Sequence, residues 1–136
     1  MSREIIFRGK RIDNGKWVCG DLAHFPNKTM IDTHKHGQPW RGYTVNPETV
    51  GQYTGLFDKN GKKIFEGDII KTHSGLLGKV VYGSFFDDEY CGDACGWFWI
   101  GKDRENHTYK LALSSCWGEH KVIGNIHNNP KLLKEV

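Results

Sequence analysis

The 136-residue sequence has no long hydrophobic run. No segment approaches the roughly 18 apolar residues that a membrane-spanning helix needs. Only three apolar residues follow residues 1–4, where a secretory signal would carry its hydrophobic stretch. We therefore expect a cytoplasmic chain with no membrane association. In that reducing compartment we expect no disulfide among the four cysteines, which are Cys19, Cys91, Cys95 and Cys116.

The sequence also lacks the motifs of the common enzyme classes. Its seven histidines form no H-E-x-x-H motif and no recognisable catalytic triad. Several Gly-Lys pairs occur, but none lies in the frame of a phosphate-binding loop. We therefore expect no catalytic residue, no cofactor and no enzymatic activity.

Strong charge of either sign is missing as well. The net charge of +3 is mild, and a dedicated duplex-binding protein usually has a concentrated basic stripe. The most basic stretch contains Arg3, Arg8, Lys10, Arg11 and Lys16. Together with exposed aromatic residues, this stretch supports one alternative function, the weak and salt-sensitive binding of nucleic acid.

Glycine and short β-forming runs are what the sequence has in quantity. Its 17 glycines are spread among short apolar runs, which is typical of many strands joined by tight turns. Asn14-Gly15 and Asn60-Gly61 mark hairpins, and Asn14-Gly15 suits a type I′ turn. We predict an exposed loop over 33–42 and two strands within about 4–24. Further strands are predicted at 29–32, 43–45, 50–53, 64–65, 69–71, 76–82, 97–100, 110–113 and 122–126.

One helix is predicted, at the end of the chain. Asn129 suits the N-cap, Pro130 suits the first helical position, and Leu132 and Leu133 can pack inward. No linker interrupts the apolar alternation. We therefore expect a single domain over 1–136, with strands and a loop region in 1–45 and a β-barrel region in 46–136.

The block at residues 66–70 has a structural interpretation. Gly67 can take a positive φ, and Asp68 can accept backbone hydrogen bonds in the resulting turn. Ile69 or Ile70 then enters the core. Such starts occur in SH3-like barrels, so we favour a structural role for this block over a direct functional one.

Cys91-x3-Cys95 is the nearest approach to a metal motif. Zinc sites usually take paired ligands two to four residues apart, and this pair fits that spacing. Cys116 has no second cysteine nearby, although His120 follows it and a Cys3His site is conceivable. We favour the alternative, in which these are small hydrophobic or incidental loop residues and no zinc is bound.

An acidic loop is predicted over 87–93. Its carboxylates could chelate Mg²⁺ or Ca²⁺, but no calcium-loop spacing is present. A solvated loop is the favoured interpretation, and a metal-dependent enzyme built here or at the cysteines is the second alternative function. The carboxylates are those of Asp87, Asp88, Glu89 and Asp93.

The tryptophans carry a stronger signal. Trp97 and Trp99 share one face of a predicted strand by the period of two, and Phe98 and Ile100 share the other. Either both faces are buried within the fold, or one face meets a partner. From the second interpretation we predict a homo-oligomer whose interface includes Trp97, Trp99 or their neighbours.

Three blocks of the sequence resemble the YopX family of phage and prophage proteins. The first is REIIFRGK at 3–10 with GKWV at 15–18 and GDL at 20–22. The second is PETVGQYTGL at 47–56 with DKNG at 58–61 and IFEGDII at 64–70. The third is VIGNI at 122–126, followed by Asn129-Pro130 and Leu132-Leu133. They occur in family order and span nearly the whole chain.

The resemblance implies a mainly β fold with an SH3-like barrel, a phage or prophage context in a bacterial cytoplasm, and self-association. It brings no catalytic residues. Our leading hypothesis is a non-enzymatic accessory protein that acts by binding protein.

Overall fold

The computed structural model describes residues 4–87, 92–113 and 120–134. These residues form two antiparallel sheets, one 3-10 turn and one short α-helix. None of the described helices is long and apolar enough to cross a membrane. The predicted mainly β fold is confirmed.

The chain divides into two compact units, Met1–Gly55 and Leu56–Val136. One sheet has the strand order β4-β3-β2-β1-β5-β6. Residues 46–55 pack with the N-terminal unit because the start of β5 pairs with β1, Arg8 opposite Gly51. The bounds are β1 Phe7–Lys10, β2 Trp17–Phe25, β3 Lys28–Asp32, β4 Gly42–Val45, the 3-10 turn Pro47–Thr49, β5 Gly51–Phe57 and β6 Lys63–Phe65.

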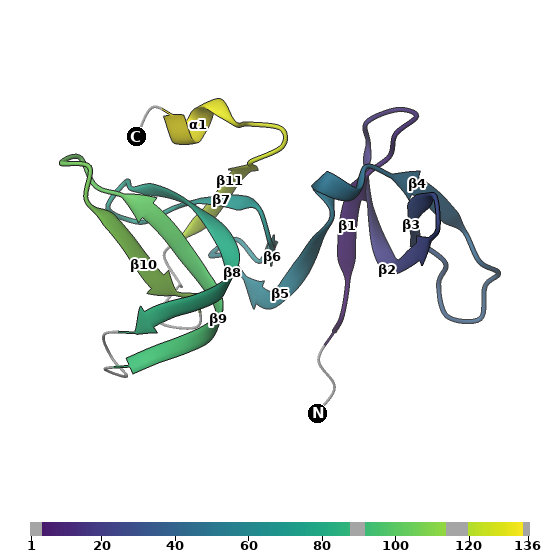
Figure 1. Ribbon diagram of the computed structural model, residues 1–136, viewed down its shortest axis with the longest axis horizontal. Coiled ribbons are helices and arrows are strands. Elements are labelled where there is room, and N and C mark those ends of the chain that lie inside the picture. The colour runs from purple at the N-terminus through teal and green to yellow at the C-terminus, as the bar shows by residue number, and fades with distance from the viewer. Residues whose placement is uncertain (1–3, 88–91, 114–119, 135–136) are drawn as a thin grey trace. The chain divides into compact units, whose positions relative to one another are not determined.

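The second sheet lies in the C-terminal unit and has the order β10-β9-β8-β7-β11 (Figure 1). The core cluster of the C-terminal unit contains Ile64, Ile70, Val80, Trp99 and Leu113. The bounds are β7 Asp68–Lys71, β8 Leu77–Asp87, β9 Gly92–Lys102, β10 Thr108–Ala112, β11 Lys121–Asn125 and α1 Lys131–Lys134.

The first hairpin forms where predicted, but its turn is of another type. A type I′ turn needs positive φ at both central residues, and of this pair only Gly15 has it, at 69°. Arg11 N donates to Lys16 O at 2.9 Å and Gly15 N donates to Arg11 O at 3.0 Å. Asn14 instead accepts a hydrogen bond from Lys16 N through its side chain. The predicted turn type is therefore wrong, because this side-chain bond and one left-handed glycine suffice.

The Gly67-Asp68 turn is confirmed in each part. Gly67 has a φ of 87°, and the buried Asp68 carboxylate accepts a hydrogen bond from Phe65 N at 2.8 Å. Ile69 and Ile70 are both fully buried. A polar side chain thus fixes the turn that delivers two apolar side chains to the core.

The two central residues of the tryptophan-bearing strand, one on each face, are covered by the chain itself. On one face Trp99 is fully buried, and its indole N–H donates to Ile70 O at 3.1 Å. Gly78 leaves room for this indole, since a Cβ there would lie 2.4 Å from the ring. Phe98 is buried on the other face. The first interpretation is therefore correct for Trp99 and Phe98, whereas Trp97 and Ile100 are half-buried, and the homo-oligomer stays a prediction.

The predicted C-terminal helix is present as α1, directly after Pro130. The side chain of Asn129 turns back toward β11, where it accepts a hydrogen bond from Asn125 N at 3.3 Å. No closed barrel is found among the described residues. The far edge of β4 returns to the end of β1 through a single bridge, Arg11 with Val45.

Candidate functional site

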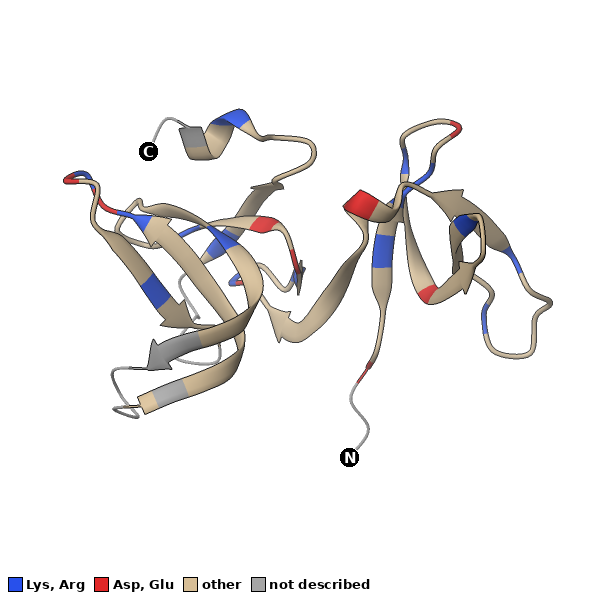
Figure 2. Cartoon of the chain, viewed as in Figure 1, with Lys and Arg blue, Asp and Glu red and all other residues tan. Residues whose placement is uncertain are grey.

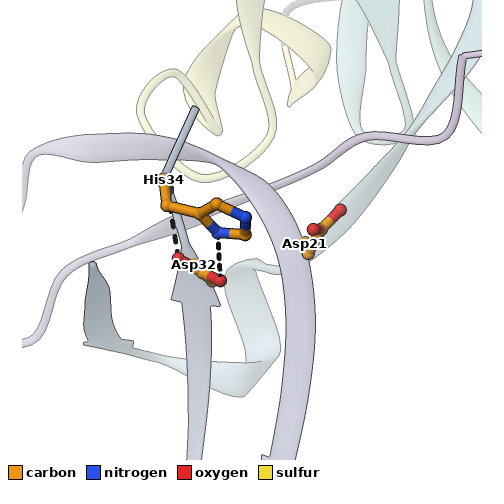
Figure 3. A group of neighbouring side chains, drawn as sticks. All are labelled: Asp21, Asp32 and His34. Atoms are coloured by element: carbon orange, nitrogen blue, oxygen red, sulfur yellow. Dashed lines mark hydrogen bonds and ion pairs between the residues drawn. The ribbon is translucent and has the colours of Figure 1, made fainter. Parts of the chain in front are cut away.

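Two aspartates face each other across β2 and β3. Asp21 pairs directly with Asp32, and Asp32 pairs directly with Gly42 on β4. Directly paired residues of antiparallel strands present their side chains on the same face. Two carboxylates therefore lie side by side, an arrangement that costs stability when both are ionised. Figure 3 shows them together with His34, which follows β3.

Asp32 closes the 33–42 loop. It is only 6% exposed. Its Oδ1 accepts hydrogen bonds from His34 N at 3.1 Å and Arg41 N at 2.9 Å, and its Oδ2 lies 2.5 Å from His34 Nδ1. Thr33 adds two bonds to Arg41 O, from its N at 2.8 Å and its Oγ1 at 3.1 Å. The loop is exposed as predicted, but its two ends are held firmly.

Burial acts to raise the pKa of the Asp32 carboxyl, because it penalises the charged form. The backbone N–H groups of Arg41 and His34, together with the His34 ring, outweigh burial and hold that pKa below its ordinary value. Asp32 is therefore ionised at neutral pH.

His34 brings an imidazole to the two carboxylates. One ligand atom from each of Asp21, Asp32 and His34 lies within 4.8 Å of the others. Because Nδ1 faces Asp32, the ring has a fixed orientation, and the other ring nitrogen retains its own bonding capacity. Two oxygens and one nitrogen are ligand types that a divalent cation accepts, but the 2.5 Å hydrogen bond between His34 Nδ1 and Asp32 Oδ2 leaves no room for an ion between those two atoms.

Trp40, in the 33–42 loop, lies over Gly42, which is paired with Asp32 as Asp32 is with Asp21. A Cβ on Gly42 would lie 2.0 Å from the Trp40 ring, so the indole takes the space beside Asp32 that a side chain at 42 would fill. The indole is nevertheless 54% exposed. Glycine at 42 is thus needed for this close approach, and the loop presents an aromatic surface next to the carboxylates.

A second cluster of the same composition follows β9. The Asp103 Oδ1 accepts hydrogen bonds from the backbone N of Glu105 and His107, and its Oδ2 accepts one from Tyr109 at 3.0 Å. His107 Nδ1 lies 3.2 Å from Asp103 Oδ2. Glu105 and His107 are largely exposed. All these residues belong to one hairpin connection and its first strand residues.

A groove with two exposed apolar side chains lies elsewhere in the N-terminal unit. Ile12 and Phe25, 66% and 44% exposed, both line a cavity of about 380 Å³. We call it the Ile12–Phe25 groove. Lys28 is the one charged residue among its described lining residues, and its Nζ lies 5.5 Å from the Phe25 ring centre. The other lining residues are Pro26, Asn27, Thr29, Thr44, Val45 and Pro47.

Three basic residues of the N-terminal stretch, Arg8, Lys10 and Arg11, contact aromatic or acidic side chains of their own unit. Figure 2 colours Lys and Arg blue along the ribbon. Arg8 is buried with its guanidinium 4.8 Å from the Trp17 ring centre. Arg11 makes two hydrogen bonds to Asp13, at 2.9 and 2.6 Å, and lies 4.2 Å from the Tyr43 ring centre. Charges held in this way are poorly placed to contact phosphates, which weakens the case for nucleic-acid binding.

The sequence-based metal candidates fall partly outside the described residues. Cys91 and Cys116 lie there, so the Cys3His arrangement with His120 stays untested. Cys95 is exposed on β9, with its Sγ 3.9 Å from the Tyr82 hydroxyl. The two ends of the predicted acidic loop belong to strands, because β8 runs through Asp87 and β9 begins at Gly92. Asp88 and Glu89 are likewise outside the description.

Sequence reasoning missed the cluster around Asp32. It assigned His34 to a solvated loop and gave no role to either aspartate. A local signal was present: an aspartate at a strand end can accept the N–H two residues later, which places His34 against it. The pairing with Asp21 depends on the β2–β3 register, which local sequence does not specify.

Comparison with known proteins gives one clear relationship. No curated protein matches the chain. Among solved structures, the crystal structure of protein EF1440 from Enterococcus faecalis is similar, with a TM-score of 0.48 and 25% identity over 97% of this chain and 99% of that one. The family described as YopX protein matches residues 6–134. The chain therefore belongs to the YopX family.

Proposed function

We propose that this chain is a non-enzymatic phage or prophage accessory protein that binds another protein through the Ile12–Phe25 groove. The observation that carries the proposal is the exposure of two large apolar side chains in one groove. Apolar surface gathered in a concave site commonly marks a protein interface. Burying an isoleucine or phenylalanine side chain there contributes about 1.5–3 kcal/mol.

The groove is built on ordered backbone. Ile12 N donates to Thr44 O at 3.2 Å, which ties the first hairpin turn to β4. Phe25 ends β2 directly opposite Lys28. Backbone that is already hydrogen-bonded loses less entropy on binding than a free loop does. Lys28 at the rim favours a partner segment that is apolar with a nearby acidic group.

Family resemblance supports three further parts of the proposal: an SH3-like barrel arrangement, a bacterial cytoplasmic location and self-association. The groove offers a surface for self-association that is separate from the strand bearing Trp97 and Trp99.

The test is capture by crosslinking from a phage-infected bacterial lysate. The double substitution Ile12→Ser, Phe25→Ser is expected to lose the captured protein. Ile5→Ser is the matched control, because Ile5 is 61% exposed and does not line the groove. Equal capture by all three chains would refute the groove as the binding site. Light scattering of the purified chain shows whether the partner is a second copy.

A further inference from the structure

We infer that the C-terminal unit binds a small phosphorylated molecule in a hollow lined by Lys59, Lys71 and Lys121. The hollow has a volume of about 330 Å³, and we call it the lysine hollow. Its other described lining residues are Thr72 and His73, so none of the described lining residues is acidic. The hollow belongs to a different unit from the Ile12–Phe25 groove, and the proposal does not depend on protein binding there.

The strand register places two of the lysines side by side. Lys71 ends β7 and Lys121 begins β11, and the two residues are directly paired. Directly paired residues of antiparallel strands present their side chains on the same face, where like charges repel. Both residues are exposed, and neither forms an ion pair within the part of the chain that the structure describes. An anion between the two ammonium groups would convert this repulsion into attraction.

The connection between β5 and β6 brings the third lysine. Asp58, which precedes Lys59, is only 7% exposed. Its Oδ2 accepts a hydrogen bond from Val122 N at 3.0 Å, and Lys59 N donates to His120 O at 2.9 Å. These two bonds fix the connection to the start of β11. The backbone that carries Lys59 is therefore held beside the paired lysines before any ligand binds.

The carboxylate of Asp58 does not cancel the positive charge of the lysine hollow. Its Oδ1 accepts hydrogen bonds from Asn60 N at 2.9 Å and Lys62 N at 2.8 Å, so both of its oxygens are engaged by backbone N–H groups. Burial acts to raise the pKa of Asp58, but these backbone bonds outweigh burial and hold that pKa below its ordinary value. Asp58 thus contributes one negative charge against three lysines, and positive charge stays in excess.

The charge and the size of the lysine hollow fit a phosphate group on a small molecule. A phosphate ester carries about −1.5 to −2 charges at neutral pH and three strong acceptor oxygens. Lysine binds phosphate as a compact point charge with three N–H donors. A single carboxylate would neutralise only one of the three lysines. The volume lies at the lower end of the ~300–1,000 Å³ that is usual for ligand pockets, which leaves room for a small organic group beside the phosphate.

The composition of the lysine hollow favours a small molecule over a nucleic-acid strand. Proteins that bind single strands combine basic grooves with aromatic side chains on which successive bases stack. The imidazole of His73 is the one ring among the described lining residues, and it already stacks on His120, with ring centres 6.1 Å apart. Its ring N–H can donate to a phosphate oxygen.

The test is titration of the full-length chain with inorganic phosphate at constant ionic strength, followed by two-dimensional NMR of the backbone amides. We expect saturable shifts at Lys71, His73 and Lys121. Lys71→Gln and Lys121→Gln are each expected to weaken phosphate binding at least about tenfold, because each removes one charge-assisted contact. Lys110→Gln is the matched control, since Lys110 is an exposed lysine on β10 of the same unit, outside the hollow. This variant is expected to bind as the unmodified chain does.

Thermal unfolding supplies a second readout. In chloride, Lys71→Gln should be at least as stable as the unmodified chain, because it relieves the repulsion between the paired lysines. Phosphate should raise the unfolding temperature of the unmodified chain more than that of Lys71→Gln. The difference between the two chains is the measure, because phosphate also stabilises proteins in general by exclusion from their surface.

Three outcomes would overturn the proposal. The first is the absence of saturable shifts in the unmodified chain. The second is phosphate binding that Lys71→Gln and Lys121→Gln weaken no more than Lys110→Gln does. The third comes from comparing thymidine monophosphate with a short oligothymidylate, which a site for one small phosphorylated molecule should bind about equally. Binding of the oligothymidylate at least about tenfold tighter through the same lysines would identify a nucleic-acid interface instead.

Discussion

Two aspartate–histidine clusters in this chain follow the same local pattern in different surroundings. Asp32 and Asp103 each accept the backbone N–H two residues later, and each contacts a histidine Nδ1. Asp32 lies at the end of a strand flanked on both sides by β2 and β4, whereas Asp103 lies in a connection after β9. Neighbouring strands, rather than the local pattern, decide which aspartate becomes buried.

The difference also appears in what sets the two pKa values. For Asp103 the backbone N–H of His107 is the largest influence and lowers the pKa. For Asp32 burial is the largest influence and acts upward, yet the hydrogen bonds overcome it. A buried carboxylate that stays ionised depends strongly on its partners, because water cannot replace them.

The largest expected difference in the free energy of unfolding comes from the strands near the two clusters, β3 and β10. Ile31 precedes Asp32 and is fully buried, so Ile31→Ala should lower the free energy of unfolding by ~2–5 kcal/mol. Leu111 on β10 is exposed, so Leu111→Ala should cost no more than ~0.5 kcal/mol. Urea unfolding measures both. An equal decrease in the free energy of unfolding for both variants would show that Ile31 and Leu111 do not differ in packing.

The next largest difference between the clusters is expected in the unfolding temperature when the charge of each aspartate is removed. Asp32→Asn keeps one oxygen that can accept the two backbone N–H bonds, but it replaces Oδ2, which faces His34 Nδ1, with an NH2 group and removes the negative charge within a nearly buried site. We expect a drop of several degrees in unfolding temperature at neutral pH. Asp103→Asn should have a smaller effect, because water can reach the freed donors. A larger drop for Asp103→Asn would contradict the comparison.

Acid should abolish the difference in unfolding temperature between the unmodified chain and each of the two Asn variants. Each aspartate has its folded pKa below the ordinary value of 3.8, so its stabilising contribution is present above that pH. The contribution is lost as the pH falls below 3.8 and through the lower folded pKa. The gap in unfolding temperature between the unmodified chain and each Asn variant should therefore close in acid. Thermal melts across a pH series measure it, and a gap that widens in acid would reverse the sign.

Much of the fold followed from local sequence. Every predicted strand is present, because glycine turns and alternating apolar residues fix short strands locally. Gly67 and Asp68 could be assigned roles because a turn of that kind has few solutions. The type of the first turn was missed, since Asn14 satisfies Lys16 N through its side chain.

The candidate site was much less predictable. The contact of His34 with Asp32 is local, but the burial of Asp32 requires both β2 and β4 beside it. The meeting of Asp21 with Asp32 requires one register out of several. Trp99 shows the same limit, because its burial depends on the distant Gly78, a pairing that a strand pattern does not contain.

The smallest expected effect concerns Tyr109, which only the exposed cluster contains. Its hydroxyl donates to Asp103 Oδ2 at 3.0 Å, and this bond with the nearby negative charge raises the pKa of Tyr109 above its ordinary value of 10.0. Ultraviolet titration of the unmodified chain minus Tyr109→Phe isolates this phenol. In the Asp103→Asn background, the same difference titration should shift to lower pH. Tyr109→Phe should leave the unfolding temperature nearly unchanged, because Tyr109 is exposed. A phenol that titrates identically with and without the Asp103 carboxylate would show that the hydrogen bond does not persist in solution.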